Sequence, residues 1–231
     1  MTTLPPFHHS PADPPRDCPR CPRLAAFRAD NRAEFPDWFN APVPTFVGER
    51  PRLLIVGLAP GLRGANRTGR PFTGDYAGVL LYETLIASGL ARGDYRQNAD
   101  DGLTLIGAAI TNAVRCVPPQ NKPLPAEIAN CRPFFSATFA AFPELRAILA
   151  LGRIAHDQVL RALGLRLADW SFGHGQRHDL PATSERRGLT LFDSYHCSRY
   201  NTNTGVLTEK MFRDVVEAAA TAIGAQPMGV G

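Results

Sequence analysis

The segment from Leu53 to Asp75 constrains the fold more than any other part of this sequence. It begins with an apolar run, Leu53 to Val56, which ends at Gly57. The next eighteen residues, 58–75, contain four glycines, two prolines, three arginines and a single acid, Asp75 at the end. A buried strand that leads into a glycine-rich, basic loop is how α/β proteins build a pocket for a phosphate- or base-bearing ligand. The segment therefore predicts both a strand and a ligand site.

Short apolar runs alternate with longer helical stretches along the rest of the chain. Such alternation is typical of βαβ units, which form a parallel sheet with helices on both faces. The sequence thus predicts an α/β fold with a central, mainly parallel four-stranded sheet. A single domain is expected over residues 18–224, with a disordered tail at 1–17 and a frayed end at 225–231. The expected strands are Leu53–Val56, Leu103–Ile110, Arg146–Leu151 and Leu189–Phe192, and the expected helices are Leu24–Phe35, Tyr76–Ser88, one from about Pro125 that Pro133 breaks or restarts, Ile154–Leu163 and Leu207–Ile223.

Residues that could carry chemistry follow three of these strands. Gly57 comes after the first strand, Asn112 after the second and His196 after the fourth. Because ligands of parallel α/β sheets bind at the carboxyl ends of the strands, we expect these residues to converge. The convergence carries more weight than any single motif.

The overall composition indicates a globular protein with a basic surface. Hydrophobic residues make up 44% of the 231 residues and charged residues 20%, with a formal net charge of +4. This balance favours a polyanionic partner, although only weakly. No apolar stretch approaches the roughly 20 residues of a membrane span, and the N-terminus lacks the pattern of a secretory signal. We therefore expect a cytoplasmic protein.

Four of the five cysteines form two pairs. Cys18 and Cys21 are close enough in sequence for two thiolates to bind one metal centre, whereas fourteen residues separate Cys116 from Cys131. In a reducing compartment, such cysteines favour metal binding or catalysis over disulfides. Their spacing alone does not decide between structural zinc, an iron–sulfur cluster and free buried thiols.

Three longer blocks of the sequence resemble the uracil-DNA glycosylase superfamily, and within it family 5, the type B group. The blocks are GLAPGLRGANRTGRPFTGD (57–75), TNAVRC (111–116) and SYHCSRYNTNTG (194–205), and the resemblance covers about residues 18 to 215. It implies a three-layer α/β/α sandwich and the removal of uracil, and also of hypoxanthine and xanthine, from DNA. It further implies that a 4Fe–4S cluster, rather than zinc, is bound by Cys18, Cys21, Cys116 and Cys131.

Two positions depart from the pattern of related enzymes. Family 4 has an acid directly after the first glycine of the loop, where it positions the hydrolytic water, but this chain has Leu58 there. Leu58 fits family 5, whose enzymes are known for a broader substrate range. The second departure is Cys197, which follows the histidine at a place where the family usually has proline. We do not expect Cys197 to be a cluster ligand.

The resemblance and the chemistry of base excision together assign roles to three polar residues. Cleavage of an N-glycosidic bond places negative charge on the leaving base and oxocarbenium character on the sugar. His196 is expected to donate to the base O2 and so stabilise this anion, and Asn112 to match the base edge with one donor and one acceptor. Asp75 could orient water or stabilise the oxocarbenium ion. It also occupies the sequence position of a helix N-cap, and both roles stay open.

The walls of the base pocket are expected to come from the same glycine-rich loop. Phe72 should stack on a base that is flipped out of the duplex, although a position in the core is nearly as consistent with the sequence. Gly57, Ala59 and Gly61 would let backbone amides approach the base and the water.

DNA is expected to bind to the basic loop and to the segment after His196. Arg199 and Tyr200 are placed to enter the duplex and fill the gap left by a flipped nucleotide, and Ser198 and Asn201 suit phosphate contacts. The expected partners are double- and single-stranded DNA with deaminated bases, bound by a nucleoid-associated monomer. The loop residues that supply positive charge are Arg63, Arg67 and Arg70.

Two other functions are compatible with parts of this pattern. A nucleotide-binding α/β enzyme could use the glycine-rich loop as a phosphate cradle, but the chain lacks both GxGxxG and GxxxxGK[ST]. A non-catalytic iron–sulfur module that only binds DNA would be consistent with Leu58, since leucine can neither accept nor donate a proton.

Overall fold

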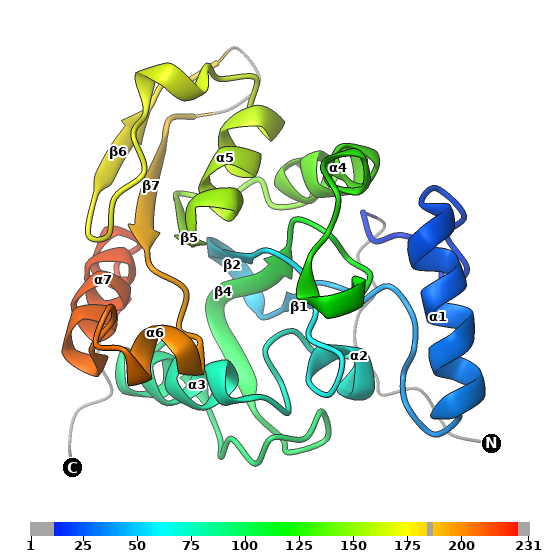
Figure 1. Cartoon of the computed structure of the whole chain (residues 1–231). Helices are drawn as coiled ribbons and strands as arrows, with labels where there is room; N and C mark the ends of the chain where they lie inside the picture. Colours follow the sequence, from blue (N-terminus) through cyan, green and yellow to red (C-terminus); the bar gives the residue numbers. More distant parts are fainter. Residues whose placement is uncertain (1–11, 184–186, 226–231) are drawn as a thin grey trace.

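A mixed sheet forms the centre of the molecule. The computed structural model describes residues 12–183 and 187–225, whose helices and strands are arranged as in Figure 1. The sheet has seven strands in the order β1-β4-β2-β5-β7-β6, with β3 paired to β4. Its parallel strands are β2 (Glu49–Gly57), β4 (Thr104–Asn112), β5 (Ala147–Leu151) and β7 (Leu189–Ser194). The antiparallel additions are β1 (Phe46–Val47), β3 (Ala91–Arg92) and β6 (Arg177–Leu180).

The four strands predicted from apolar runs are the four parallel ones, so the mainly parallel α/β fold is confirmed. The expected number of strands was too low, because the sheet has seven. The three additional strands are two to four residues long. They are too short to give an apolar run or a clear alternation, which are the signals of a buried strand.

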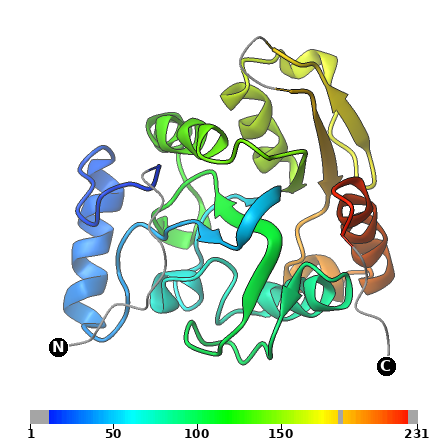
Figure 2. The same cartoon turned by 180° about the vertical axis from the view of Figure 1, so that it is seen from behind.

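The side chains of β2 alternate between the two faces of the sheet and bury both. Leu53 and Ile55 belong to one apolar cluster, and Leu54 and Val56 to another. The first cluster includes residues of α3 (Tyr76–Ala87) and α7 (Glu209–Ala222), and the second includes residues of α4 (Pro125–Ala140) and α5 (Arg153–Ala162). Figures 1 and 2 show these helix pairs on opposite sides of the sheet. The chain is therefore a three-layer α/β/α sandwich.

Helix α4 corrects one expectation, because it runs without interruption through Pro133. Proline inside a helix removes one backbone hydrogen bond and costs about 3 kcal/mol. Two features of α4 offset that cost. The carboxylate of Glu127 accepts from the backbone N–H of Leu124 at 2.7 Å, which caps the start, and Phe135 and Phe139 anchor the second half in the core.

The remaining helices are short or lie outside the sandwich. Helix α1 (Pro22–Glu34), predicted at Leu24–Phe35, stands apart from the sheet at the edge of the molecule (Figure 1). None of the helices in the described residues is long and apolar enough to cross a membrane. The short elements are α2 (Ala65–Thr68), α6 (Arg199–Asn203) and the 3-10 turns Pro119–Asn121 and Leu167–Asp169.

Part of the expected N-terminal tail is packed against the fold. The Asp13 carboxylate accepts from Arg115 Nη1 at 2.6 Å and from the Thr45 hydroxyl at 2.9 Å. The side chains of Arg115 and Asp13 are 1% and 4% exposed. The prediction of disorder is therefore wrong for residues 12–17, because Asp13 is needed to compensate a buried charge. Residues 1–11 and 226–231 lie outside the described residues.

We expect Asp13→Asn to lower the free energy of unfolding by about 3–5 kcal/mol, since it leaves the buried Arg115 guanidinium without its counter-charge. Asp17→Asn is the matched control, because Asp17 pairs with Arg32 at 2.6 Å on the surface and exposed pairs contribute little. Urea denaturation of both variants measures the difference. Equal midpoints for the two variants would show that the buried pair does not anchor this segment.

Candidate active site

A cavity of about 670 Å³ opens where the loops after β2, β4 and β7 meet. Its walls come from the glycine-rich loop, the end of β4, the 3-10 turn Pro119–Asn121 and the residues after β7. The expected convergence at the carboxyl ends of the strands is thus present. The lining residues are Leu58, Ala59, Pro60, Gly61, Leu62, Arg63, Gly64, Ala65, Phe72, Asp75, Tyr76, Ala77, Asn112, Asn121, His196, Ser198 and Arg199.

The innermost part of the cavity depends on the absence of a side chain at Gly57. Gly57 is paired with Asn112 in the register of β2 and β4. A Cβ at position 57 would lie 2.5 Å from the Asn112 Oδ1 atom and 2.6 Å from the Phe72 Cζ atom. Glycine therefore lets the amide and the ring approach each other across the strand end.

Phe72 forms the wall of the cavity and is also part of the core. Its side chain is 7% exposed, and its ring lies 5.8 Å from the His196 ring, centroid to centroid, at an interplanar angle of 29°. Its backbone is left-handed, with φ 53°. The hydroxyls of Tyr82 and Tyr95 hold this turn by donating to the carbonyls of Pro71 (2.6 Å) and Phe72 (3.1 Å). The two roles expected for Phe72 are therefore compatible.

Arg70 is the exception among the residues expected to bind DNA. Its side chain is 1% exposed, and its guanidinium donates to both oxygens of Asp101 at 2.8 and 2.7 Å. The same group lies 5.2 Å from the centre of the Tyr82 ring. Arg70 therefore supports the loop from inside and does not face DNA. The sequence could not reveal this, because Asp101 lies thirty-one positions further along the chain.

Asp75 caps helix α3 and lines the cavity at the same time. Its Oδ1 atom accepts from the backbone N–H of Gly78 at 3.2 Å, while its Oδ2 atom is directed toward the loop, 3.3 Å from where a Cβ on Gly61 would stand. Burial raises the pKa of Asp75, although the N–H groups of Gly78 and Ala77 oppose the shift. The cap role is thus present, and one oxygen remains directed at the pocket.

His196 and Asn112 offer hydrogen-bonding groups to the cavity. Within residues 12–183 and 187–225, neither the His196 ring nor the Asn112 amide has a hydrogen-bond partner, so both can serve a ligand. Burial lowers the pKa of His196 to about 4, so the imidazole is neutral at physiological pH and still donates through one N–H.

The residues after His196 form one edge of the cavity and an exposed turn. The Ser198 hydroxyl caps α6 by accepting from the Asn201 N–H at 3.4 Å. The Asn201 amide donates to the His196 carbonyl at 2.8 Å, which uses one of its two N–H groups. Arg199 lies over the Tyr76 ring at 5.2 Å, and Tyr200 is 75% exposed. Arg63 and Arg67 are also exposed.

Two polar residues that line the cavity, Tyr76 and Asn121, were not assigned a role from the sequence. Tyr76 is 38% exposed, at the first position of α3. Asn121 lies in the turn after β4 in a left-handed conformation, with φ 57°. The only sequence signal for Asn121 is its place in a loop that follows a parallel strand, where ligand-binding residues gather.

The four paired cysteines come together at a second place, between α1, α4 and the end of β4. They line one small cavity of about 20 Å³. The Arg28 Nη1 atom donates to the Cys116 sulfur at 3.6 Å, and the Arg115 backbone N–H to the Cys131 sulfur at 3.4 Å. The fifth cysteine, Cys197, is buried in the core and donates to the Ala77 carbonyl at 3.5 Å. The four cysteines that line the small cavity are Cys18, Cys21, Cys116 and Cys131.

Known proteins share both the length and the pattern of this chain. The model of the uracil DNA glycosylase superfamily matches residues 44–220. The chain belongs to the uracil-DNA glycosylase superfamily. A type-5 uracil-DNA glycosylase of Thermus thermophilus is 43% identical over 213 residues, which cover 90% of this chain and 94% of the relative. The type-5 enzyme of Pyrobaculum aerophilum is 37% identical and covers 90% of each chain. A type-4 enzyme of Saccharolobus solfataricus is 27% identical, covering 91% and 85%.

These type-5 relatives confirm the resemblance to family 5 of the superfamily. Leu58 lines the cavity, so the place of the family 4 acid is occupied here by an apolar side chain. Asp75 is the single carboxylate among the described residues that line the cavity. Asp75 is therefore the carboxylate that these described walls offer to a ligand in the cavity.

We expect the His196 ring to stay neutral from about pH 9 down to about pH 5, and to gain a proton only near its pKa of about 4. The unfolded chain takes up this proton near pH 6.5, so the stability that the neutral ring contributes is lost as the pH falls from about 6.5 to about 4. An NMR titration of the imidazole resonances in folded and urea-unfolded protein measures both values. A folded-state midpoint near 6.5 would contradict the effect of burial on the pKa of this ring.

Proposed function

We propose that this protein removes uracil, hypoxanthine and xanthine from DNA by hydrolysing the N-glycosidic bond. Membership of the superfamily supports the reaction, and the type-5 names of its relatives support uracil as a substrate. The observation that carries the proposal is one cavity in which an aromatic wall and two polar side chains, which have no hydrogen-bond partner among the described residues, face the same space. A volume of about 670 Å³ leaves room for purines as well as pyrimidines.

The flipped base is held by Phe72 and Asn112 in this proposal. The Phe72 ring offers a stacking face that does not depend on the polar pattern of the base. The Asn112 amide offers a donor and an acceptor beside that ring, as the edges of uracil and hypoxanthine require. Gly57, Ala59 and Gly61 keep the surrounding backbone accessible. A pocket that relies on stacking and one amide discriminates weakly among bases, which supports a broad substrate range.

The leaving base is stabilised by His196. As the bond to the sugar breaks, negative charge develops on the base, and the neutral imidazole donates an N–H to the base oxygen without giving up its proton. A neutral donor is available for this role, because burial lowers the pKa of His196 to about 4 in the free protein. Asp75 stabilises the oxocarbenium ion or orients the water through the oxygen that does not cap α3.

DNA binding is assigned to exposed and partly exposed residues of the glycine-rich loop and of the segment after His196. Arg63 and Arg67 supply positive charge for the phosphates of double- and single-stranded DNA, and Ser198 and Asn201 at the start of α6 contact the backbone. Arg199 and the exposed Tyr200 fill the space that the flipped nucleotide leaves. In this proposal the protein acts as a monomer and, because its substrate is DNA, works with the nucleoid in the cytoplasm.

The cysteine group is proposed to bind a 4Fe–4S cluster, with structural zinc as the alternative. Four sulfurs around one small cavity are the ligand set of such a cluster, and the N–H groups of Arg28 and Arg115 already donate to two of them. When bound, the cluster would cross-link the segment before α1 to β4 and α4.

We expect His196→Ala to lower the rate of uracil release by about 10²–10³-fold, because it removes a hydrogen bond to developing negative charge. Asp75→Ala should have a smaller effect. Asp75→Asn is the matched control, since asparagine retains the helix cap while losing the charge. A gel assay for abasic product on oligonucleotides with uracil, hypoxanthine or xanthine measures all three variants.

Three results of this assay would change the proposal. A wild-type protein that binds DNA but gives no abasic product on any oligonucleotide would be a non-catalytic module. A greater loss for Asp75→Ala than for His196→Ala would move the main catalytic role to Asp75. Full activity of Asp75→Asn would leave Asp75 only its role as a helix cap.

We expect the protein purified without oxygen to be brown, with broad absorption near 400 nm and about four iron atoms per chain. Cys131→Ser should lose both the colour and the iron. Cys197→Ser is the control and should keep them, because Cys197 lies in the core away from the group. A colourless wild-type protein that contains zinc would favour the alternative.

A further inference from the structure

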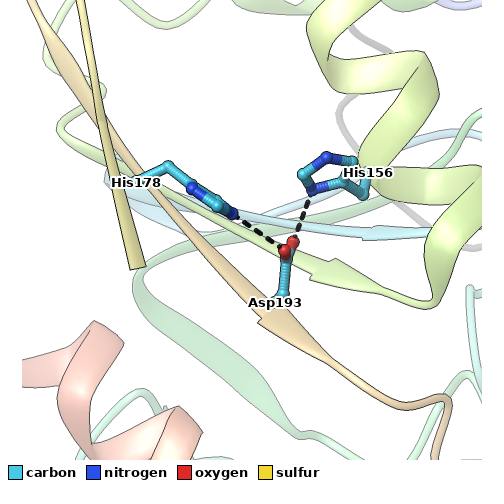
Figure 3. Close-up of side chains that lie close together, drawn as sticks. All are labelled: His156, His178 and Asp193. Carbon is cyan, nitrogen blue, oxygen red and sulfur yellow. Dashed lines mark hydrogen bonds and ion pairs between the residues drawn. The ribbon is translucent and has the colours of Figure 1, made fainter. Parts of the chain in front are cut away.

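Three polar side chains meet at a buried place outside the glycosylase cavity and the cysteine group. They are His156 of α5, His178 of β6 and Asp193 of β7, shown in Figure 3. The His156 Nδ1 atom lies 2.8 Å from Asp193 Oδ1, and the His178 Nε2 atom 3.1 Å from Asp193 Oδ2. The side chains of His156 and Asp193 are 1% and 0% exposed, and that of His178 is 11% exposed.

The tautomer of His156 requires a positive charge between the ring and the carboxylate. The Nε2 atom lies 3.0 Å from the carbonyl oxygen of Trp170, which only accepts, so Nε2 carries a hydrogen. In the neutral imidazole, Nδ1 then bears a lone pair, and this lone pair faces a carboxylate oxygen at 2.8 Å. Two acceptors at that distance repel each other unless a proton or a metal ion lies between them.

The arrangement around His156 matches a metal site in three respects. One ligand atom from each of the three residues lies within 4.8 Å of the others. Two imidazoles and a carboxylate are common ligands of zinc, which then leaves a fourth position for water. Metal-bound histidines usually donate their other N–H to a carbonyl or carboxylate, as His156 does to Trp170.

A proton is the competitor of the metal at this position. Burial lowers the pKa of His156, but the Asp193 carboxylate more than compensates and raises it above the ordinary value. A proton on Nδ1 would satisfy the contact between His156 and Asp193, and neutral His178 would then donate its Nε2–H to the other carboxylate oxygen. A metal ion would instead bind the Nε2 lone pair of the other His178 tautomer, and the side chain of His178 is partly exposed, at 11%.

We propose that His156, His178 and Asp193 bind one divalent cation of the zinc class. The ion joins α5, the edge strand β6 and the end of β7. Asp193 precedes His196 by three residues, so the ion fixes the strand end from which the His196 loop departs. Its role is structural, and its binding does not depend on the activity proposed above.

Zinc titration of the purified protein by calorimetry tests this proposal against two variants. His178→Gln removes a ligand at a partly exposed position and should weaken zinc binding by more than about 100-fold. Loss of a residue that only hydrogen-bonds to a ligand weakens metal binding by about 10–100-fold, so a larger effect identifies His178 as a ligand. Asp179→Asn is the control, because it removes an exposed carboxylate from the same strand and should bind zinc normally. All proteins keep the four cysteines, so zinc on sulfur contributes equally and cancels in the comparison.

Thermal unfolding provides a second readout of the same site. Zinc should raise the melting temperature of the wild type and of Asp179→Asn, and EDTA should reverse the increase, because a ligand that binds only the folded state stabilises it. His178→Gln should show a smaller increase, limited to what zinc on sulfur contributes equally in all three proteins. Equal zinc binding by His178→Gln and the wild type would overturn the proposal. So would a wild type that binds zinc only through its cysteines, and the cation beside Asp193 would then be a proton.

Discussion

The parallel pairing of β2 with β4 determines where everything else in the pocket can lie. It places Gly57 opposite Asn112 at the same edge of the sheet, and the missing side chain at Gly57 opens the space that the Phe72 ring enters. A larger residue at this position would separate the ring from the amide. The cavity thus depends on a backbone pairing at the carboxyl ends of β2 and β4, and the loops around it complete its walls.

Buried charged groups hold the segments that the sheet does not reach. Arg70 and Asp101 fix the loop before Phe72 from inside, and Arg115 and Asp13 attach the N-terminal segment near the cysteines. Each pair joins residues far apart in the sequence. Replacing one member of a pair by a neutral residue leaves the other charge buried and uncompensated, so such substitutions destabilise the fold.

The sequence predicted what local patterns encode. The apolar runs gave the four parallel strands, and the strand ends gave the region of Gly57, Asn112 and His196. Contacts between residues far apart in the sequence could not be predicted in this way. Arg70 resembles its exposed neighbours in sequence because its partner is distant, and Pro133 resembles a helix break because the aromatic anchors of α4 are tertiary contacts. Asn121 was missed since its backbone conformation, not its residue type, brings it to the cavity.

The hydrogen bond from Asn201 to the His196 carbonyl links two parts of the proposed reaction. Helix α6 is only five residues long and begins three positions after His196. A phosphate that shifts α6 would pull directly on the backbone that carries the imidazole. Contact with the DNA strand and alignment of the leaving-group donor are then mechanically coupled, so a poorly seated duplex would leave the histidine out of line with the base.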